Sequence, residues 1–448
     1  MTVKHSEFAV FAHIDGRWAP CGQLTLGEDH VHLVSSTFEY HDSYRHSASG
    51  VEVDPVSLRF GATMGASGSR LKPTGGLAFF GALRDATPDS WGRRVIESKL
   101  NAPINGLPES TYMLHAGSER VGLLDIRRNA PDAPTQPRDD WNNLANLADA
   151  AGRVDDGLPV SGKQCDIFLQ GTGLGGARPK ASVRDEQGVL WLAKFSSRSD
   201  TFDIPAVECA SLSLAAEAGL RTPPVKTMTL GAHNVMLIRR FDRYWKVPRS
   251  EAMAESGRLT SRPGDGRTEH RAAFVSALTL VGCDESQSRD MSYADLARAM
   301  GVYCHAGFVR RDLHELFKRM VFNIFTSNDD DHLRNHGFWC DEHSSGWRLS
   351  PLYDVLPRPS IASERFLHLG IGAQGRLATV DNALSEHEGF CLSWQAAAEV
   401  ISEVWDAIRD WRRHFEASGV EGDDIEKVAS AFRSIDDIAS AELRRKLP

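Results

Sequence analysis

A run of acidic, amide and imidazole side chains near residue 330 is the part of the sequence best suited to chemistry. The segment Ser327–His336 reads SNDDDHLRNH. In the catalytic loop of protein kinases, the aspartate that receives the hydroxyl proton lies five residues before an asparagine that binds a metal ion. Asp330 and Asn335 have this separation, 335 − 330 = 5, whereas Asp329 and Asp331 give six and four. The spacing predicts Asp330 as the catalytic residue and Asn335 as a metal ligand.

An isolated aspartate beyond this segment suits the second metal ligand of such a site. Asp354 lies in Pro351–Leu356, PLYDVL, where it is flanked by apolar residues after the strand-like Trp347–Ser350. A carboxylate in apolar surroundings needs a partner, and Mg²⁺ prefers oxygen ligands. The pattern favours Asn335 and Asp354 as a Mg²⁺ pair. The alternative is a carboxylate that only caps backbone amides.

A glycine-rich segment upstream could hold the phosphates of a nucleotide. The segment Gly171–Lys180 reads GTGLGGARPK. Glycines let backbone N–H groups approach phosphate oxygens closely, and Arg178 and Lys180 add positive charge. The Gly-Lys-Ser/Thr ending of a Walker A loop is absent, and a cluster of glycines can equally be a plain turn. By itself the segment therefore leaves both interpretations open.

A lysine follows this segment at the end of the apolar stretch Val189–Phe195. Lys194 is costly to bury there without an anion, and in kinase folds a lysine so placed pairs with the nucleotide phosphates. Glu208, 14 residues later, could hold the lysine in place. The alternatives are a strand-edge lysine that faces solvent and an ordinary exposed glutamate.

The elements of the first part of the chain are predicted from turn and cap signals. Strands are expected around a turn at Asp15-Gly16, and a helix is expected over Pro88–Leu100. The segment Asn129–Arg138 contains three prolines in ten residues, which is typical of a linker. We therefore place a domain boundary there.

The elements around the candidate lysine have clearer signals. A helix should follow Asp203, since Pro205 suits its first turn and Gly219 suits its C-terminal cap. A strand is expected over Val235–Arg239, and Glu251–His270 lacks periodicity and is predicted to be a mobile loop.

The last part of the chain is predicted to be mostly helical. The stretch Trp394–Leu447 has a helical pattern, and an apolar stripe with steps of three and one directly precedes the acidic run. The residues of that stripe are Leu313, Leu316, Phe317, Met320, Val321 and Ile324. The acidic run should thus be presented from a rigid helix.

Composition limits the class of protein. With 448 residues, 41% hydrophobic and 25% charged, the chain has the composition of a globular protein of two or three packed units. The net charge, 51 − 60 = −9, excludes a general polyanion binder. Seven scattered cysteines without a CxxC pair predict neither a disulfide framework nor a structural zinc site, and favour a reducing cytoplasm. We expect no signal peptide and no transmembrane helix.

The chain resembles the HipA-type toxin kinases of bacterial toxin–antitoxin systems over nearly its full length. The motifs that carry the resemblance are Phe79–Trp91, Arg240–Arg243, Ser327–Asn335 and Pro351–Asp354. The resemblance implies an α+β, bilobal protein-kinase-like fold with an N-terminal β/α subdomain and a mostly helical C-terminal lobe. The expected domains are an N-terminal subdomain, a nucleotide-binding lobe and a helical lobe, at 1–135, 136–243 and 244–448.

The resemblance also assigns residues to the site. It implies Asp330 as catalytic residue and Asn335 and Asp354 as ligands of Mg²⁺, with Lys194 on the phosphates of ATP and a hinge at Arg239–Phe241. The residues implied to contact ATP are Gly175, Gly176, Ala177, Arg178, Pro179, Lys180, Lys194, Arg239, Arg240, Phe241, His332, Leu333, Arg334 and Tyr353.

Two positions depart from the family pattern. Family members carry a serine at the start of the glycine loop whose autophosphorylation inactivates the kinase, and Gly173 stands at that position here, beside Thr172. Inactivation by that route is therefore not expected, and inhibition would rest on a partner. The hinge has Arg239 where an acidic residue is familiar.

The function implied by the resemblance is an ATP- and Mg²⁺-dependent serine/threonine protein kinase that acts as a toxin in the cytoplasm. Its substrate would be a cellular protein such as an aminoacyl-tRNA synthetase, and its partner a small DNA-binding antitoxin of HipB type. Because the chain carries a net charge of −9, contact with DNA is expected only through that antitoxin. No membrane partner is expected.

Two other functions fit some of the same residues. A metal centre for phosphoester hydrolysis could use Asp329, Asp330, Asp331, His332, His336 and Asp354, since the two histidines are at i, i+4. That reading leaves the glycine-rich segment and Lys194 without a role. A catalytically weak pseudokinase that serves as a binding module is the second alternative, to which the unusual hinge would be suited.

Overall fold

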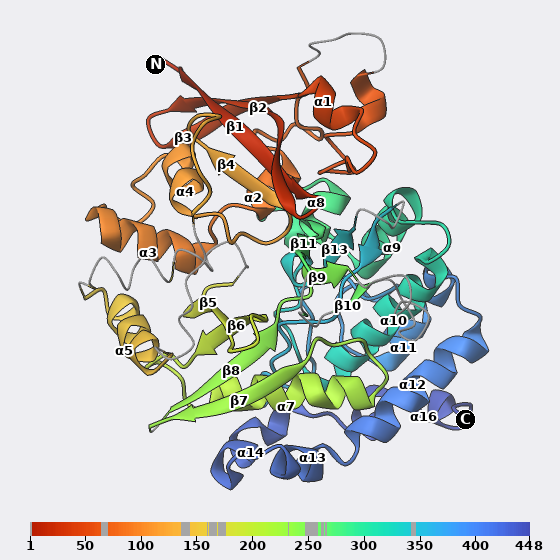
Figure 1. Cartoon of the computed structure of the whole chain (residues 1–448). Helices are drawn as coiled ribbons and strands as arrows, with labels where there is room; N and C mark the ends of the chain where they lie inside the picture. Colours follow the sequence, from red (N-terminus) through yellow and green to blue (C-terminus); the bar gives the residue numbers. More distant parts are fainter. Residues whose placement is uncertain are drawn as a thin grey trace. The chain divides into compact units, whose positions relative to one another are not determined.

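The computed structural model describes two compact units, each of which is built from separate stretches of the chain (Figure 1). Unit 1 comprises Met1–Arg198, Thr229–Gly282 and Trp339–Ser345, and unit 2 comprises Ser199–Met228, Cys283–Phe338 and Gly346–Pro448. The residues that the structure describes are 2–63, 70–135, 144–158, 160, 168, 176–231, 233–246, 259–260, 264, 267–341 and 346–448.

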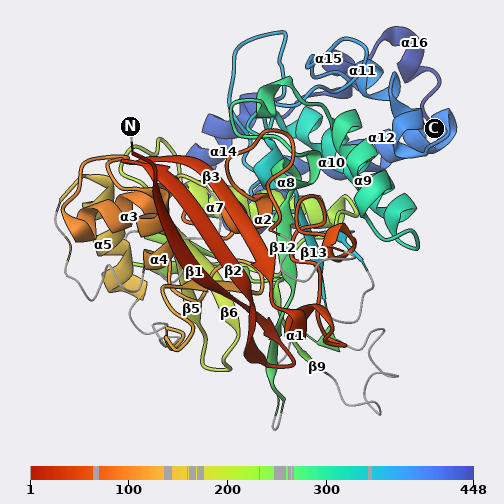
Figure 2. The same cartoon turned by 90° about the horizontal axis from the view of Figure 1, so that it is seen from above.

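Unit 1 begins with an antiparallel sheet in the order β3-β2-β1-β4. Its strands are β1 (Lys4–Ile14), β2 (Arg17–Asp29), β3 (His32–Tyr40) and β4 (Leu124–Arg127), and the first three run side by side in Figure 2. The turn between β1 and β2 has positive φ at Asp15 and Gly16, 50° and 71°, as a tight two-residue hairpin requires. The predicted hairpin is confirmed.

Short helices follow this sheet in unit 1. They are α1 (Asp42–Arg45), η1 (Phe60–Thr63), α2 (Gly81–Asp85), α3 (Ser90–Leu100), α4 (Glu109–His115), α5 (Leu144–Asp155) and α8 (Ala277–Val281). The helix predicted over Pro88–Leu100 is confirmed as α3, whose N-cap is Asp89. Phe8, Leu24, Phe38 and Phe80 are at most 1% exposed and form part of the core of this region.

A second sheet in the order β5-β6-β8-β7 carries the predicted nucleotide segment. Its strands are β5 (Lys180–Arg184), β6 (Leu190–Phe195), β7 (Val225–Leu230) and β8 (His233–Arg239), and the boundary between the units falls within β7. The strands predicted over Val189–Phe195 and Val235–Arg239 are confirmed by β6 and β8.

The prediction of a loop over Glu251–His270 is wrong at two places. β10 (Leu259–Thr260) and β11 (Glu269–Arg271) pair with β9 (Arg243–Lys246) in the order β10-β9-β11, and β12 (Ala273–Ser276) follows. Strands of two and three residues are too short to show a period of two. They exist because their backbone groups pair with β9, which a local pattern does not reveal. Residues 251–258, 261–263 and 265–266 lie outside the described part of the chain.

Unit 2 is mostly helical, as predicted. Its first helix is α7 (Ile204–Glu217), where Asp203 accepts a hydrogen bond from the backbone N of Ala206 and Gly219 follows the end at φ 79°. The other elements are η3 (Ser288–Asp290), α9 (Tyr293–Tyr303), α10 (Val309–Thr326), η4 (Leu333–Asn335), β14 (Arg348–Leu349), α11 (Val380–Leu384), η5 (His387–Phe390), α12 (Trp394–Ile408), α13 (Trp411–Ala417), α14 (Gly422–Val428), η6 (Ala429–Ala431), α15 (Ile435–Ile438) and α16 (Ala441–Arg444). β13 (Gly337–Cys340) contains the boundary between the units.

The helix α10 is the central element of unit 2. α9 and α12 pack against it, and the predicted apolar stripe is fully or almost fully buried (Figure 1). Even Arg319 on this helix is 0% exposed, because its guanidinium donates to Glu315 and to the backbone O of Ser350. A helix held on most of its sides is a rigid support for the acidic run at its C-terminal end.

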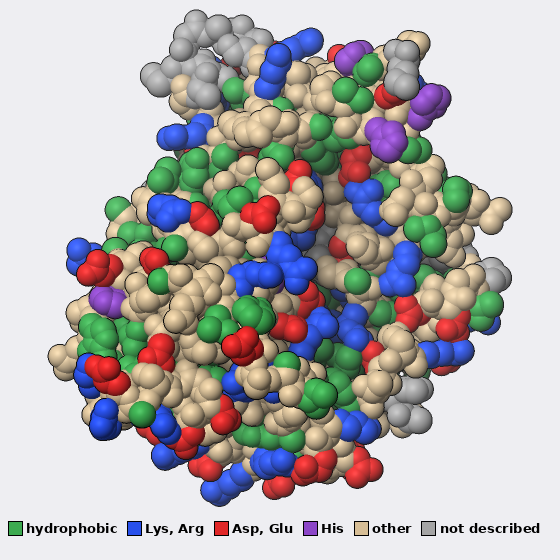
Figure 3. All heavy atoms as spheres, turned by 180° about the vertical axis from the view of Figure 1, so that it is seen from behind, with side chains coloured by type: hydrophobic (Ala, Val, Ile, Leu, Met, Phe, Trp, Pro, Cys, Tyr) green, Lys and Arg blue, Asp and Glu red, His purple; other side chains and the backbone are tan. Residues whose placement is uncertain are grey.

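Two features of the structure bear on the predicted class of protein: the charges on its surface and the hydropathy of its helices. Acidic and basic side chains are interspersed over the face shown in Figure 3. Within the part of the chain that the structure describes, none of the helices combines the length and the apolar character needed to cross a bilayer.

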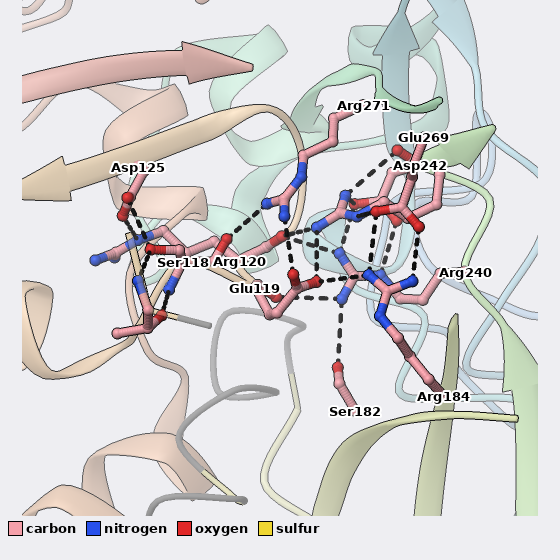
Figure 4. A network of polar contacts seen from close by, with 12 residues as sticks. Ser118, Glu119, Arg120, Asp125, Ser182, Arg184, Arg240, Asp242, Glu269 and Arg271 are labelled. Carbon is pink, nitrogen blue, oxygen red and sulfur yellow. Dashed lines mark hydrogen bonds and ion pairs between the residues drawn. The ribbon is translucent and has the colours of Figure 1, made fainter. Parts of the chain in front are cut away.

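A buried network of charges joins distant segments of unit 1 (Figure 4). At its centre, Asp242 is 1% exposed, and its carboxylate accepts four hydrogen bonds. Arg240 donates two of them at 2.7 and 2.6 Å, Arg243 donates one at 2.7 Å, and the backbone N of Gly122 donates one at 2.7 Å. Both arginines also donate to the backbone O of Arg120 at 2.9 Å. The loop before β4 is thereby fixed to the end of β8.

Glu119 is the second buried carboxylate of this network. It accepts from Arg271 at 2.8 Å and lies 3.6 Å from Arg243. Burial alone would raise the pKa of Glu119, but the surrounding guanidinium groups, that of Arg271 foremost, lower it to about 2. At the rim, Arg184 binds Glu269 through two hydrogen bonds of 2.7 and 3.1 Å.

Positive charge is in excess around this network and acts on His13 of β1. Burial first, and then the charges of Arg271 and Arg243, lower the pKa of His13 to about 3. The ring lies edge-on to Trp18, with centroids 5.1 Å apart. His13 is therefore neutral in the folded chain at any pH near neutrality, although it gains a proton below about pH 6.5 when the chain unfolds.

The stability of unit 1 should fall on mild acidification because of His13. A lowered pKa in the folded state means that stability is complete above the unfolded value and is lost as the pH falls toward the folded value. Between pH 7 and pH 5 the wild type should lose about 2 kcal/mol more than His13→Phe, which keeps a ring against Trp18. Urea unfolding followed by tryptophan fluorescence at both pH values measures this difference. Equal losses in the two proteins would refute the assignment.

Candidate active site

In unit 1, the described end of the glycine-rich segment leads into a hairpin that bears two lysines. Gly175 lies outside the described residues, as do Thr172 and Gly173. Gly176 has φ 96°, in the region that favours glycine. In the hairpin that follows, Lys180 of β5 stands directly opposite Lys194 of β6. Directly opposite residues share one face of a sheet, so the structure brings together two residues that were predicted to contact phosphates.

The two lysines are both buried. Lys194 is 9% exposed, which excludes the alternative of a strand-edge lysine in open solvent. Lys180 is 1% exposed, and its ammonium donates to Asp89 at 2.6 Å and to the backbone O of Gly176 at 2.7 Å. Two like charges that face each other on one sheet are unfavourable unless anions compensate them. For Lys180 the carboxylate of Asp89 is such an anion.

Glu208 of α7 is the predicted partner of Lys194 and belongs to unit 2. It is 3% exposed, so the alternative of an exposed helical glutamate is excluded. The pairing of Glu208 with Lys194 stays a prediction.

The predicted hinge, Arg239–Phe241, follows β8 in unit 1. The backbone N of Arg240 donates to the O of Leu190 at 3.0 Å and so extends the pairing with β6. The side chain of Arg240 is 5% exposed and lies in the network of Figure 4. The side chains of the Arg240–Arg243 motif therefore have a structural role. Contact of the hinge backbone with adenine stays a prediction.

In unit 2, the acidic run begins where α10 ends. Ser327 closes the helix with φ 48°, and the side chain of Asn328 donates to that of Asn323 at 3.0 Å. Asp331 is 1% exposed, and it accepts hydrogen bonds from Tyr293 and, at 3.0 Å, from His336. Burial alone would raise the pKa of Asp331, but the charge and hydrogen bond of His336, with that of Tyr293, lower it. These hydrogen bonds hold the loop that contains Asp331 against the rest of unit 2.

Asp330, by contrast, points toward solvent. Its side chain is 54% exposed, and one carboxylate oxygen accepts from Arg358 at 2.7 Å. The same guanidinium lies 3.3 Å from Asp329, whose side chain is also 54% exposed. Of the three consecutive aspartates, the one chosen by the spacing to Asn335 is accessible to an incoming hydroxyl, and Asp331 is not.

The predicted metal ligands lie on two loops that are joined within unit 2. The amide nitrogen of Asn335 donates to the backbone O of Asp330 at 3.0 Å, so the amide oxygen is left to accept a cation. The hydroxyl of Tyr353 donates to the backbone O of Arg334 at 2.9 Å. Asp354 follows with φ 60°, a backbone conformation that is uncommon for aspartate and that is often retained at functional sites.

The donor atoms fit Mg²⁺. An amide oxygen and a carboxylate are the oxygen ligands that this ion prefers. Within the described residues, no group of three or more His, Cys, Asp or Glu is placed to hold a metal. The six residues of the alternative phosphoesterase centre are all described, and no three of them are placed in this way.

The remaining residues predicted to contact ATP have varied surroundings. The ring of His332 lies 5.8 Å from that of His368, and Leu333 is 0% exposed, so its side chain is not accessible to a ligand. Arg334 is paired with Glu285. Ala177 is exposed, Arg178 is half-buried and Pro179 is buried. Their contact with ATP stays a prediction.

Sequence reasoning did not find three contacts. They are the Asp89–Lys180 pair, the contact of Arg358 with Asp330, and the buried set of Asp331, His336 and Tyr293. The only local signal was the separation of Asp331 from His336, which is five residues, as for Asp330 and Asn335. Partners such as Asp89 and Lys180 are 91 residues apart, and no local pattern joins them.

Comparisons with known proteins bear on the family and the fold of the chain. The family model described as the HipA-like C-terminal domain matches residues 172–412. The chain is similar to HipA of Shewanella oneidensis MR-1, solved in a complex with HipB and its operator DNA, at 15% identity and a TM-score of 0.62, over 98% of this chain and 97% of that one. It is also similar to the Helicobacter pylori proinflammatory kinase CtkA, at 14% identity and a TM-score of 0.39, over 61% and 94%. No curated protein matches significantly. The likeness to HipA confirms the predicted α+β, kinase-like fold.

Proposed function

Because this chain belongs to the HipA-like family, we propose that it is a serine/threonine protein kinase that uses ATP and Mg²⁺ and acts as the toxin of a toxin–antitoxin system. The observation that carries this proposal lies in unit 2. Asp330 is accessible at the end of a rigid helix, and Asn335 donates its amide nitrogen to the backbone O of the same aspartate. In the catalytic loop of a kinase the catalytic aspartate likewise precedes a metal-binding asparagine, which supports the proposal.

Each residue has a role in the proposed reaction. Lys194 binds phosphate oxygens of ATP, and Asn335 and Asp354 hold Mg²⁺. The ion, when bound, neutralises the charge on the phosphates. Asp330 accepts a hydrogen bond from the serine or threonine hydroxyl of the acceptor and takes its proton as the phosphate is transferred. Catalysis then rests on positioning and on charge, as is general for phosphoryl transfer.

The biological partners follow by analogy with the relative. The Shewanella HipA was solved with HipB and operator DNA. For this chain we propose a small DNA-binding antitoxin of HipB type, with DNA bound through that protein, since this chain carries a net charge of −9. The acceptor would be a cytoplasmic protein such as an aminoacyl-tRNA synthetase.

Transfer of labelled phosphate in a cell lysate tests the proposal. The full chain with γ-labelled ATP and Mg²⁺ should label one or few proteins on serine or threonine. Lys194→Met should lower the labelling by about 100-fold or more, since it removes a charge held for the phosphates. Label that appears only as free phosphate would instead indicate a hydrolase. Binding of ATP without any transfer would indicate a pseudokinase. Either result would refute the kinase assignment.

A further inference from the structure

Lys180, the last residue of the glycine-rich segment, connects this segment to the N-terminal region of unit 1. Its ammonium donates to a carboxylate oxygen of Asp89 at 2.6 Å and to the backbone O of Gly176 at 2.7 Å. The side chain is 1% exposed and that of Asp89 is 8% exposed, so this ion pair is almost free of water. A buried charge-assisted contact of this kind is sensitive to the loss of either partner.

Asp89 also begins the helix α3. Its other carboxylate oxygen accepts from the backbone N of Gly92 at 2.8 Å, as an N-cap does. One carboxylate thus fixes the start of α3 and the end of the glycine-rich segment. Its position along the chain belongs to the N-terminal region, which has no assigned role in the site.

Two further residues of α3 hold the same segment. The indole of Trp91, 0% exposed, donates to the backbone O of Lys180 at 3.0 Å. The guanidinium of Arg94 donates to the backbone O of Ala177 at 2.5 Å and pairs with Asp155 of α5 at 3.0 Å. The helix α3 and its N-cap therefore hold two residues of the stretch directly, Ala177 and Lys180, and Lys180 in turn holds Gly176.

Pro179 and Lys180 are also held by β6, since the backbone N of Phe195 donates to the backbone O of Pro179 at 3.0 Å and Lys180 pairs with Lys194. The exposed residues of the stretch lie at its other end. Gly176 and Ala177 are exposed, and Gly176 has a backbone conformation that glycine adopts freely. Backbone N–H groups bind phosphate well only when they are already fixed in place, because ordering them on binding would cost conformational entropy. External contacts must supply that order.

We propose that Asp89 is a positioning residue for the nucleotide site, which acts through Lys180 to hold the Gly176 end of the glycine-rich segment in the form that binds phosphate. Lys180 then supports the segment and does not itself contact the phosphates. The positive charge that binds the phosphates comes from other residues of the site, among them Lys194, which lies opposite Lys180 on the hairpin. The role of the N-terminal region is to fix this segment through α3. The inference rests on the proposed kinase function.

A double-mutant cycle distinguishes two possible roles of Lys180: a structural support that acts together with Asp89, and an independent ligand of the phosphates. Asp89→Asn keeps an oxygen for the N-cap and removes the anion that faces Lys180. Asp89→Asn, Lys180→Met and the double variant should each weaken Mg·ATP binding about tenfold, because all three remove the same contact. If Lys180 bound phosphate independently of Asp89, the effects would multiply to about 100-fold in the double variant. That result, or an unchanged affinity in Asp89→Asn, would overturn the proposal.

Hydrogen exchange of the backbone amides of residues 176–180, without nucleotide, gives a second measurement. Asp89→Asn should speed this exchange, and Arg94→Gln, whose side chain is 34% exposed, should do so to a smaller extent. Glu403→Gln breaks an ion pair of similar length, 2.7 Å with Lys318, and is the matched control that should change neither exchange nor affinity. Unchanged exchange in both test variants would overturn the proposal.

The two proposals fail in different ways. If the wild type does not bind Mg·ATP in calorimetry, the kinase assignment fails, and the exchange experiment still decides whether α3 holds the segment. If the wild type binds and transfers phosphate but Asp89→Asn does the same with unchanged kcat and KM for ATP, only the role of Asp89 fails.

Discussion

Replacing Asp330 with alanine should lower the rate of phosphoryl transfer by about 10²–10⁴-fold and leave the Kd for Mg·ATP nearly unchanged. The reason is that Asp330 acts on the acceptor hydroxyl, whereas Asn335 and Asp354 are the proposed metal ligands. The side chain is 54% exposed, so its removal should not unfold unit 2. Single-turnover transfer measures the rate, and calorimetry with a non-hydrolysable nucleotide measures the affinity.

The neighbouring Asp329 provides the control for this experiment. Its side chain is equally exposed, at 54%, and it contacts the same guanidinium of Arg358. Asp329→Ala should therefore reduce transfer by less than about tenfold, since it lacks the spacing to Asn335. Equal losses in both variants would contradict the assignment of Asp330, and loss of nucleotide binding in Asp330→Ala would give that residue a metal or structural role.

Replacing Asp242 with asparagine should destabilise unit 1 by about 3–5 kcal/mol. The substitution preserves the shape of the side chain but removes the charge that compensates Arg240 and Arg243, which are 5% and 2% exposed. Buried guanidinium groups without a counter-ion are strongly unfavourable. Urea unfolding followed by circular dichroism measures the loss.

An exposed ion pair serves as the comparison for Asp242. Asp436 is paired with Arg444, but its side chain is 69% exposed. Asp436→Asn should change the free energy of unfolding by less than about 1 kcal/mol, because solvent screens such a pair. If Asp242→Asn were as mild as Asp436→Asn, the network of Figure 4 would not be a major source of stability.

Local signals were sufficient for the elements that carry the site. The helix α7 was predicted from Asp203, Pro205 and Gly219, and all three are found in their expected positions at its ends. The helix α10 was predicted from its apolar stripe, because burial repeats with the period of a helix. These features depend on neighbours in the sequence, so they can be read without the fold.

The contacts between distant segments could not be predicted in the same way. The Arg240–Arg243 motif overlaps the predicted hinge, Arg239–Phe241, and its side chains are found in a network with Glu119 and Gly122, about 120 residues earlier. Nothing near Arg240 in the sequence reveals these partners. The choice between Asp330 and Asp331 shows the same limit, because the spacing selects one aspartate but only the fold shows that the other is buried against Tyr293.

The network of Figure 4 also affects how the chain can acquire its structure during synthesis. Glu119 and Arg271 are 152 residues apart, so a ribosome that adds about 5–20 residues per second exposes the carboxylate roughly 10–30 s before its partner. For that interval β4 can already pair with β1, but Glu119 lacks Arg271 as its counter-ion. A fragment cut near residue 135 would remain in this incomplete state. The contact between Glu119 and Arg271 can therefore form only after the segment that ends at Arg271 has been synthesised.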